Sequence, residues 1–153
     1  MITIEVKRKE GEFGFEAKDA SGHVVRLDTS AETGGINFGV RPMQMLLMGL
    51  GGCSGIDIVS ILKKQRLVIE DFSMKITGER EKDIDPSLWE SIHIVFELTG
   101  NIDADKAYRA CALSIDKFCS VAQTLKRSGT KITWEVNVNA NQQEAIGNRN
   151  SEI

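Results

Sequence analysis

The sequence has 153 residues, of which 41% are hydrophobic and 27% are charged. This composition is typical of a globular domain with its own core and excludes a disordered chain. The 19 basic and 22 acidic side chains give a net charge of −3 and form no basic stripe, so we expect no nucleic acid as a partner.

The N-terminal part of the chain is predicted to form a β meander. Apolar and polar residues alternate over residues 2–6, 13–17 and 24–27, and turn-forming segments separate the three runs. Because no charged lead followed by an apolar segment precedes them, we expect no signal peptide and a cytoplasmic protein. A loop with several glycines, residues 28–41, is expected to follow the meander.

Residues 42–66 are predicted to form a long central helix. Pro42 suits the first helical position, and the first half is apolar on nearly every side, which predicts burial all round. The uncharged stretch at residues 42–56 is too short to span a bilayer, so no membrane partner is expected. Glycines inside the helix imply a close backbone contact or a break; they are Gly49, Gly51, Gly52 and Gly55.

The second half of the chain begins with two more runs of alternating residues. Residues 72–76 and 92–98 flank a polar connection and predict a long β-hairpin. Asp103 is then expected to cap a helix that continues to Phe118.

A short helix and a last strand are predicted to complete the chain. Ser120 is expected to cap a helix that ends at Arg127, and residues 132–138 are expected to form a strand. The order of elements favours an α+β fold. Residues 1–138 are expected to form a single domain, and the polar tail at residues 139–153 is expected to be partly disordered.

Several common types of site find little support in the sequence. His23 and His93 are the only histidines and no C-x-x-C pair occurs, so neither a zinc site nor a cofactor is expected. The glycines at residues 49–52 follow a helix rather than a strand, which makes a phosphate cradle improbable. Residues 51–55 resemble a nucleophile elbow with cysteine as the nucleophile but lack the preceding strand.

The three cysteines are the remaining candidates for chemistry. Cys111 and Cys119 are eight positions apart on one predicted helix, a rise of about 12 Å, and therefore cannot pair locally. Cys53 and Cys119 each adjoin an apparent helix start, where free N–H groups stabilise a thiolate. Since free cysteine commonly serves as a small buried hydrophobe, spacing alone leaves reactive and structural interpretations open.

Two segments resemble a known family. Residues 41–66, RPMQMLLMGLGGCSGIDIVSILKKQR, are similar to the central helix of the OsmC/Ohr family, the osmotically inducible and organic hydroperoxide resistance proteins. Residues 113–121, LSIDKFCSV, resemble the family's second cysteine segment, and the order of elements agrees over about residues 2–138. The resemblance implies an OsmC-like fold, in which antiparallel sheets pack around a long central helix, and an intertwined homodimer with active sites at the subunit interface.

The resemblance also implies a cysteine-based hydroperoxide reductase that acts in oxidative stress defence. Cys53 would attack a small organic hydroperoxide, and Cys119 would resolve the resulting sulfenic acid as a disulfide. A dithiol reductant, lipoyl-linked or thioredoxin-like, would then restore the two thiols. Cys111 matches no functional position and is expected in the core.

The chain departs from the family's pattern beside the catalytic helix. In the hydroperoxidase members, a glutamate after the helix-opening proline holds an arginine that activates the thiolate, whereas Met43 and Gln44 follow Pro42 here. Arg8 or Arg41 would supply the arginine, and Gln44 would orient it by hydrogen bonding. Two alternatives stay open: binding of an apolar ligand at the dimer interface without turnover, and general thiol–disulfide chemistry.

Overall fold

The computed structural model describes residues 1–140, which form two compact units. The first unit is Met1–Met48, and the second begins at Gly49. The predicted single domain over residues 1–138 stays a prediction. Of the tail predicted at residues 139–153, all but the first two residues lie outside the described part of the chain.

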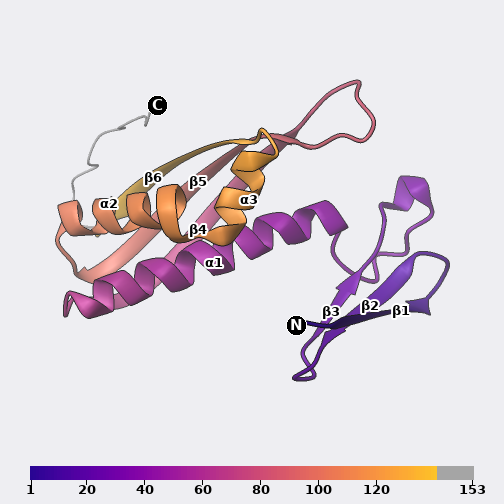
Figure 1. Ribbon diagram of the computed structural model, residues 1–153, viewed down its shortest axis with the longest axis horizontal. Coiled ribbons are helices and arrows are strands. Elements are labelled where there is room, and N and C mark those ends of the chain that lie inside the picture. The colour runs from indigo at the N-terminus through magenta and orange to yellow at the C-terminus, as the bar shows by residue number, and fades with distance from the viewer. Residues whose placement is uncertain (141–153) are drawn as a thin grey trace. The chain divides into compact units, whose positions relative to one another are not determined.

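The first unit contains a three-stranded antiparallel sheet in the order β1-β2-β3 (Figure 1). The strands are β1 (Ile4–Glu10), β2 (Gly14–Asp19) and β3 (Val24–Leu27), and a single turn of 3₁₀ helix follows at Ala31–Thr33. The predicted meander is therefore confirmed. The strand β1 continues to Glu10, and the chain reverses at Gly11, whose φ of 55° is readily adopted by glycine.

Asp28 organises the loop that follows β3. Its side chain is only 2% exposed, and its carboxylate accepts hydrogen bonds from the backbone N–H groups of Thr29 at 2.7 Å, Ile36 at 2.9 Å and Phe38 at 3.0 Å. The N–H of Phe38 contributes most to a lowered pKa of Asp28, against the opposing effect of burial. One carboxylate thus satisfies three backbone donors and fixes the path of the loop.

The predicted long helix is confirmed as α1 (Pro42–Lys64), an unbroken helix of 23 residues. It ends before the predicted residue 66 because Arg66 adopts a left-handed conformation with φ 60°. The helix is not broken at its glycines, and two of them, Gly51 and Gly55, mark close packing, whereas a Cβ atom at Gly49 or Gly52 would meet nothing within 4 Å. A Cβ atom at Gly55 would lie 3.0 Å from the Met74 methyl carbon on the adjacent strand.

The expectation that the first half of α1 is buried all round is wrong for the single chain. In the first half, Leu46 is 41% exposed and Met48 is 52% exposed, whereas Leu50 is fully buried, and in the second half Ile56 is 71% exposed. By length and composition alone, the complete helix Pro42–Lys64 is apolar enough to cross a membrane, whereas the uncharged stretch at residues 42–56 is too short. Core helices of soluble proteins meet the same criterion. One face of α1 packs on its own chain and the other presents apolar side chains outward.

The second unit contains a sheet in the order β4-β5-β6. The strands β4 (Val68–Arg80) and β5 (Trp89–Asn101) form the predicted long antiparallel hairpin. The last strand, β6 (Lys131–Val138), pairs with β5 in parallel, which departs from the expected antiparallel sheets. The reason is the helical crossover between β5 and β6, since parallel neighbours require such a connection.

One face of this sheet forms the core of the second unit. Alternate side chains of β5 are at most 1% exposed: Ile92, Ile94, Phe96 and Leu98. The helices lie over the sheet on this side (Figure 1). The first crossover helix, α2 (Ala104–Leu113), begins as predicted at Asp103, whose side chain accepts the Lys106 N–H at 2.9 Å.

The crossover changes its helical form before α3. The predicted continuation of the helix to Phe118 is instead a π-helical turn at Ser114–Phe118, in which the Cys119 N–H donates to the Ser114 carbonyl at 2.8 Å. The next helix is α3 (Ser120–Arg127), and its N-cap is Cys119 rather than the predicted Ser120. The wide turn therefore places a cysteine at the start of α3.

Candidate active site

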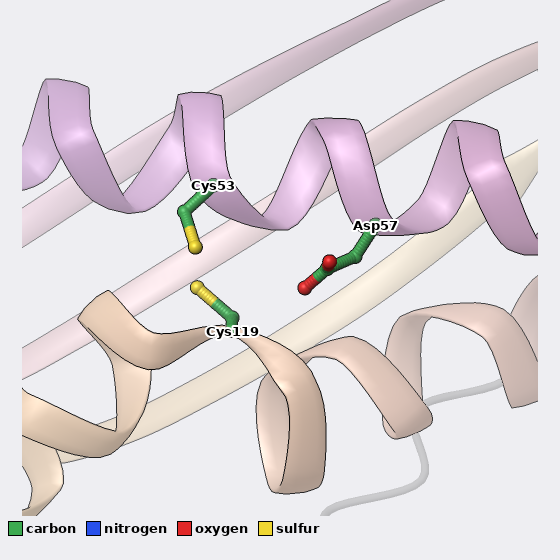
Figure 2. A group of neighbouring side chains, drawn as sticks. All are labelled: Cys53, Asp57 and Cys119. Carbon is green, nitrogen blue, oxygen red and sulfur yellow. The ribbon is translucent and has the colours of Figure 1, made fainter.

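The fold brings together two cysteines that are 66 positions apart in the sequence. Cys53 lies in the middle of α1, and Cys119 lies at the N-cap of α3. Their sulfur atoms point toward each other (Figure 2), and both thiols are free. Cys53 does not adjoin the start of its own helix, contrary to the sequence-based expectation, but it faces the start of α3.

The first turn of α3 lowers the pKa of the Cys53 thiol. Burial by itself raises this pKa, but the Val121 N–H and then the Cys119 thiol hydrogen-bond the sulfur and favour the thiolate. Ser120 contributes its backbone N–H and its hydroxyl, whose oxygen is 3.9 Å from the Cys53 sulfur. The pKa is therefore below its usual value of 9.0, as expected for a thiol at a helix N-terminus.

Cys119 has the opposite ionisation behaviour. Its side chain is fully buried, and its sulfur accepts the Ala122 N–H at 3.4 Å as the cap of α3. Burial, followed by the adjacent Cys53 sulfur, raises the pKa of Cys119 to about 12. The pair therefore consists of a half-buried Cys53 thiol whose pKa is lowered and a buried Cys119 thiol that keeps its proton at neutral pH.

Asp57 is part of the same cluster and was not predicted as a site residue. One of its carboxylate oxygens and the sulfurs of Cys53 and Cys119 all lie within 4.8 Å of one another (Figure 2). The Ser114 hydroxyl donates to Asp57 Oδ2 at 3.1 Å. The available sequence signal was spacing, because residues four positions apart on a helix share a face.

The third cysteine lies elsewhere. Cys111 is fully buried on α2, and burial raises its pKa to about 12. A thiol of this kind behaves as a small apolar side chain. Its surroundings agree with the expected core position.

The three polar residues expected to support the cysteines belong to the first unit, whereas the cysteine pair belongs to the second. Gln44 Oε1 accepts the Arg41 N–H at 3.2 Å, which satisfies a free donor at the start of α1. The Arg41 guanidinium donates to the Gly39 carbonyl at 3.1 Å. Arg8 lies on the exposed strand β1. The supporting roles of Arg8, Arg41 and Gln44 stay predictions.

Comparison with known proteins identifies the family. The family model described as OsmC-like protein matches residues 33–135, which include both cysteines of the pair. The chain belongs to the OsmC-like protein family. It is 40% identical to Protein YhfA of Escherichia coli K12 over 128 residues, covering 83% of this chain and 91% of that protein.

Solved structures of other proteins share the fold of this chain. A protein from Aquifex aeolicus VF5 is 31% identical with a TM-score of 0.74, covering 91% of this chain and 98% of that one. An organic hydroperoxide resistance protein OsmC from Legionella pneumophila has a TM-score of 0.69 at 17% identity, covering 90% and 97% of the two chains. These matches confirm the α+β OsmC-like fold predicted from the sequence.

Proposed function

We propose that this protein is a cytoplasmic, cysteine-based reductase of organic hydroperoxides that acts in oxidative stress defence. The main support is the geometry of one pair of side chains: Cys53, half-buried and with a lowered pKa, faces Cys119, a buried and protonated thiol. The description of the Legionella relative as an organic hydroperoxide resistance protein supports the substrate class.

The first step uses Cys53 as the nucleophile. Its thiolate attacks the distal oxygen of the hydroperoxide, the O–O bond breaks, and the alcohol leaves after taking up a proton. The sulfur is oxidised to a sulfenic acid while the peroxide is reduced by two electrons. The first turn of α3 stabilises the attacking thiolate, through the Val121 and Ser120 N–H groups in particular.

The second step uses Cys119. Its sulfur attacks the Cys53 sulfur, the S–O bond breaks, and the hydroxyl leaves as water with the proton from the Cys119 thiol. The two sulfurs already point toward each other, so the intrachain disulfide requires little movement (Figure 2). A dithiol reductant, lipoyl-linked or thioredoxin-like, then becomes oxidised as it returns both cysteines to thiols.

We further propose that the working form is a homodimer. The outward face of α1 carries exposed apolar side chains, including Ile56 at 71% and Val59 at 40% exposure. These two side chains line a shallow apolar groove of about 380 Å³ together with Gly52, Phe72 and other residues. Contiguous apolar surface of this kind is typical of a subunit interface.

The proposal is tested by single-turnover oxidation of the fully reduced protein. Mixing with cumene hydroperoxide in a stopped-flow instrument should consume one peroxide per chain. Peptide mapping by mass spectrometry should then find Cys53 joined to Cys119. Cys53→Ser should abolish the reaction, whereas Cys119→Ser should stop at a sulfenic acid on Cys53 that dimedone traps.

Cys111→Ser serves as the matched control, because Cys111 is fully buried outside the pair. This variant should consume peroxide at the rate of the unmodified protein. A dominant cross-link through Cys111, or no disulfide after peroxide treatment, would contradict the proposed function. Dihydrolipoamide and reduced thioredoxin, supplied separately, identify the reductant by the turnover each one supports.

A further inference from the structure

Three potential metal ligands meet between α1 and the start of α3. They are the Cys53 and Cys119 sulfurs and an Asp57 carboxylate oxygen, all within 4.8 Å of one another. We propose that in the reduced protein these three side chains bind a thiophilic divalent cation, with Zn²⁺ as the physiological ion. This goes beyond peroxide reduction and does not depend on it.

The distances fit a small tetrahedral ion after a modest contraction. Zinc bonds of about 2.3 Å to sulfur and about 2.1 Å to oxygen place two sulfurs about 3.8 Å apart and a sulfur and an oxygen about 3.6 Å apart. The upper limit of 4.8 Å for the ligand atoms is therefore about 1 Å longer than the bound geometry requires. Rotation of the three side chains about their χ angles supplies a shift of this size without moving the helices.

The surroundings orient the carboxylate. The buried Ser114 hydroxyl lies 3.1 Å from Asp57 Oδ2 and 3.4 Å from the Ser54 carbonyl, and its single proton, shared between these two acceptors, orients the carboxylate. Hydrogen bonds of this type fix ligand orientation in metal sites. Cys119 is fully buried and Cys53 is half-buried, so Cys53 provides the solvent-facing side by which an ion enters.

The chemical type of the three ligand atoms determines which class of ion they bind. Two thiolates favour Zn²⁺ and similar soft cations over Mg²⁺ or Ca²⁺, which prefer oxygen ligands. Three protein ligands leave a fourth tetrahedral position for water. No zinc site was expected from the sequence, because zinc motifs are recognised by short spacings and these cysteines come from distant segments.

Metal binding and oxidation exclude each other chemically. Each thiol loses its proton when it binds the ion, and each thiolate then donates one lone pair to the metal and becomes a weaker nucleophile. The Cys53–Cys119 disulfide offers no thiolate and cannot bind. Bound Zn²⁺ therefore shields the reduced pair from peroxide, and oxidation of the pair releases the ion.

Cobalt provides the direct test, because Co²⁺ replaces Zn²⁺ and is visible by absorption. Anaerobic titration of the reduced, full-length protein with Co²⁺ should give sulfur-to-cobalt charge-transfer bands and the strong visible bands of a tetrahedral site. The bands should saturate at one ion per chain and disappear on addition of Zn²⁺. No peroxide is present, so the result is independent of whether the protein reduces hydroperoxides.

Variants locate the ion. Cys53→Ser and Cys119→Ser should each remove the bands, Asp57→Asn should weaken binding at least tenfold, and Ser114→Ala should weaken it about tenfold. Asp116→Asn is the matched control, because Asp116 pairs with Lys126 at 2.9 Å outside the cluster, and this variant should bind normally. Absence of the bands, or bands that survive in Cys53→Ser or are unaffected by Asp57→Asn, would overturn the proposal.

Discussion

The first turn of α3 contacts both cysteines, but in different ways. Cys119 is the N-cap itself, and its buried sulfur accepts the Ala122 N–H. Cys53 approaches the same turn from α1 and is hydrogen-bonded by the Val121 and Ser120 N–H groups. A single helix start thus lowers the pKa of one thiol while burial raises the pKa of the other.

Removal of one hydrogen-bond donor, the Ser120 hydroxyl, should raise the pKa of Cys53. Ser120→Ala deletes the hydroxyl 3.9 Å from the Cys53 sulfur and keeps a residue suited to the first helical turn. Because the lost donor favours the thiolate, the pKa of Cys53 should rise and its alkylation at neutral pH should slow by about two- to tenfold. The pH dependence of iodoacetamide labelling measures this shift. As the control, Ser128→Ala at the other end of α3 should leave the pH profile of labelling unchanged. An unshifted pH profile in Ser120→Ala would show that the Ser120 hydroxyl does not stabilise the Cys53 thiolate.

Asp28 should make the stability of the protein depend on acid pH. Its pKa is lowered in the folded state by backbone N–H groups, first that of Phe38. The ionised form therefore stabilises the fold above the unfolded value of 3.8, and this contribution is lost as pH falls through the lower folded value. Asp28→Asn should melt at a lower temperature at neutral pH and lose less stability than the unmodified protein below pH 3.8.

Circular dichroism melting curves across this pH range test the effect of Asp28. Glu12→Gln, an exposed carboxylate beside the same sheet, is the control and should follow the unmodified protein. Equal acid sensitivity of the Asp28→Asn variant and the unmodified protein would show that other carboxylates are responsible.

The structure of α3 depends on the side chain at its N-cap. Cys119→Ser retains an oxygen that accepts the Ala122 N–H, whereas Cys119→Ala leaves this donor unsatisfied. The alanine variant should therefore be less stable than the serine variant by about 1 kcal/mol. Urea unfolding of the two reduced proteins measures the difference. Equal stability would mean that the 3.4 Å contact does not cap the helix.

Regular periodicity made most elements predictable. Alternation over residues 92–98 identified β5, and Asp103 marked the start of α2 because its side chain caps the helix. The parallel pairing of β6 was not predictable in the same way, since a strand's own pattern does not identify its neighbour. The π-helical turn at Ser114–Phe118 also escaped prediction, because its apolar spacing resembles that of an α-helix.

Only those site residues that lie in segments matching the family pattern could be predicted from the sequence. Cys53 and Cys119 came from two matching segments, and the structure places their side chains together. Asp57 had no such signal beyond its spacing from Cys53, because its proximity to Cys119 depends on how α3 packs. The supporting role of Gln44 stays a prediction; its side chain accepts a hydrogen bond from the Arg41 backbone N–H at the start of α1.

At the scale of the whole molecule, α1 has more apolar surface than one chain covers. Leu50, Ile58 and Leu62 are fully buried, while Met48 and Ile56 are more than half exposed. The sequence pattern, apolar on nearly every side, is explained if a second copy covers the outward face. Apolar side chains on both faces of α1 then follow from two separate packing requirements, one within the chain and one between the two copies.

Disruption of that face should therefore separate the subunits. Ile56→Asp introduces a charge at a position that is 71% exposed in one chain, so the monomer should fold normally. In a dimer the same carboxylate becomes buried without a partner, which should weaken association by about 100-fold or more. Sedimentation velocity at micromolar concentration should show a dimer for the unmodified protein and a monomer for Ile56→Asp. As the control, Lys64→Gln at the exposed end of α1 makes the net charge more negative by one unit, as Ile56→Asp does, and this variant should remain dimeric. If the unmodified protein is monomeric, or if Ile56→Asp leaves the dimer intact, this face is not the interface.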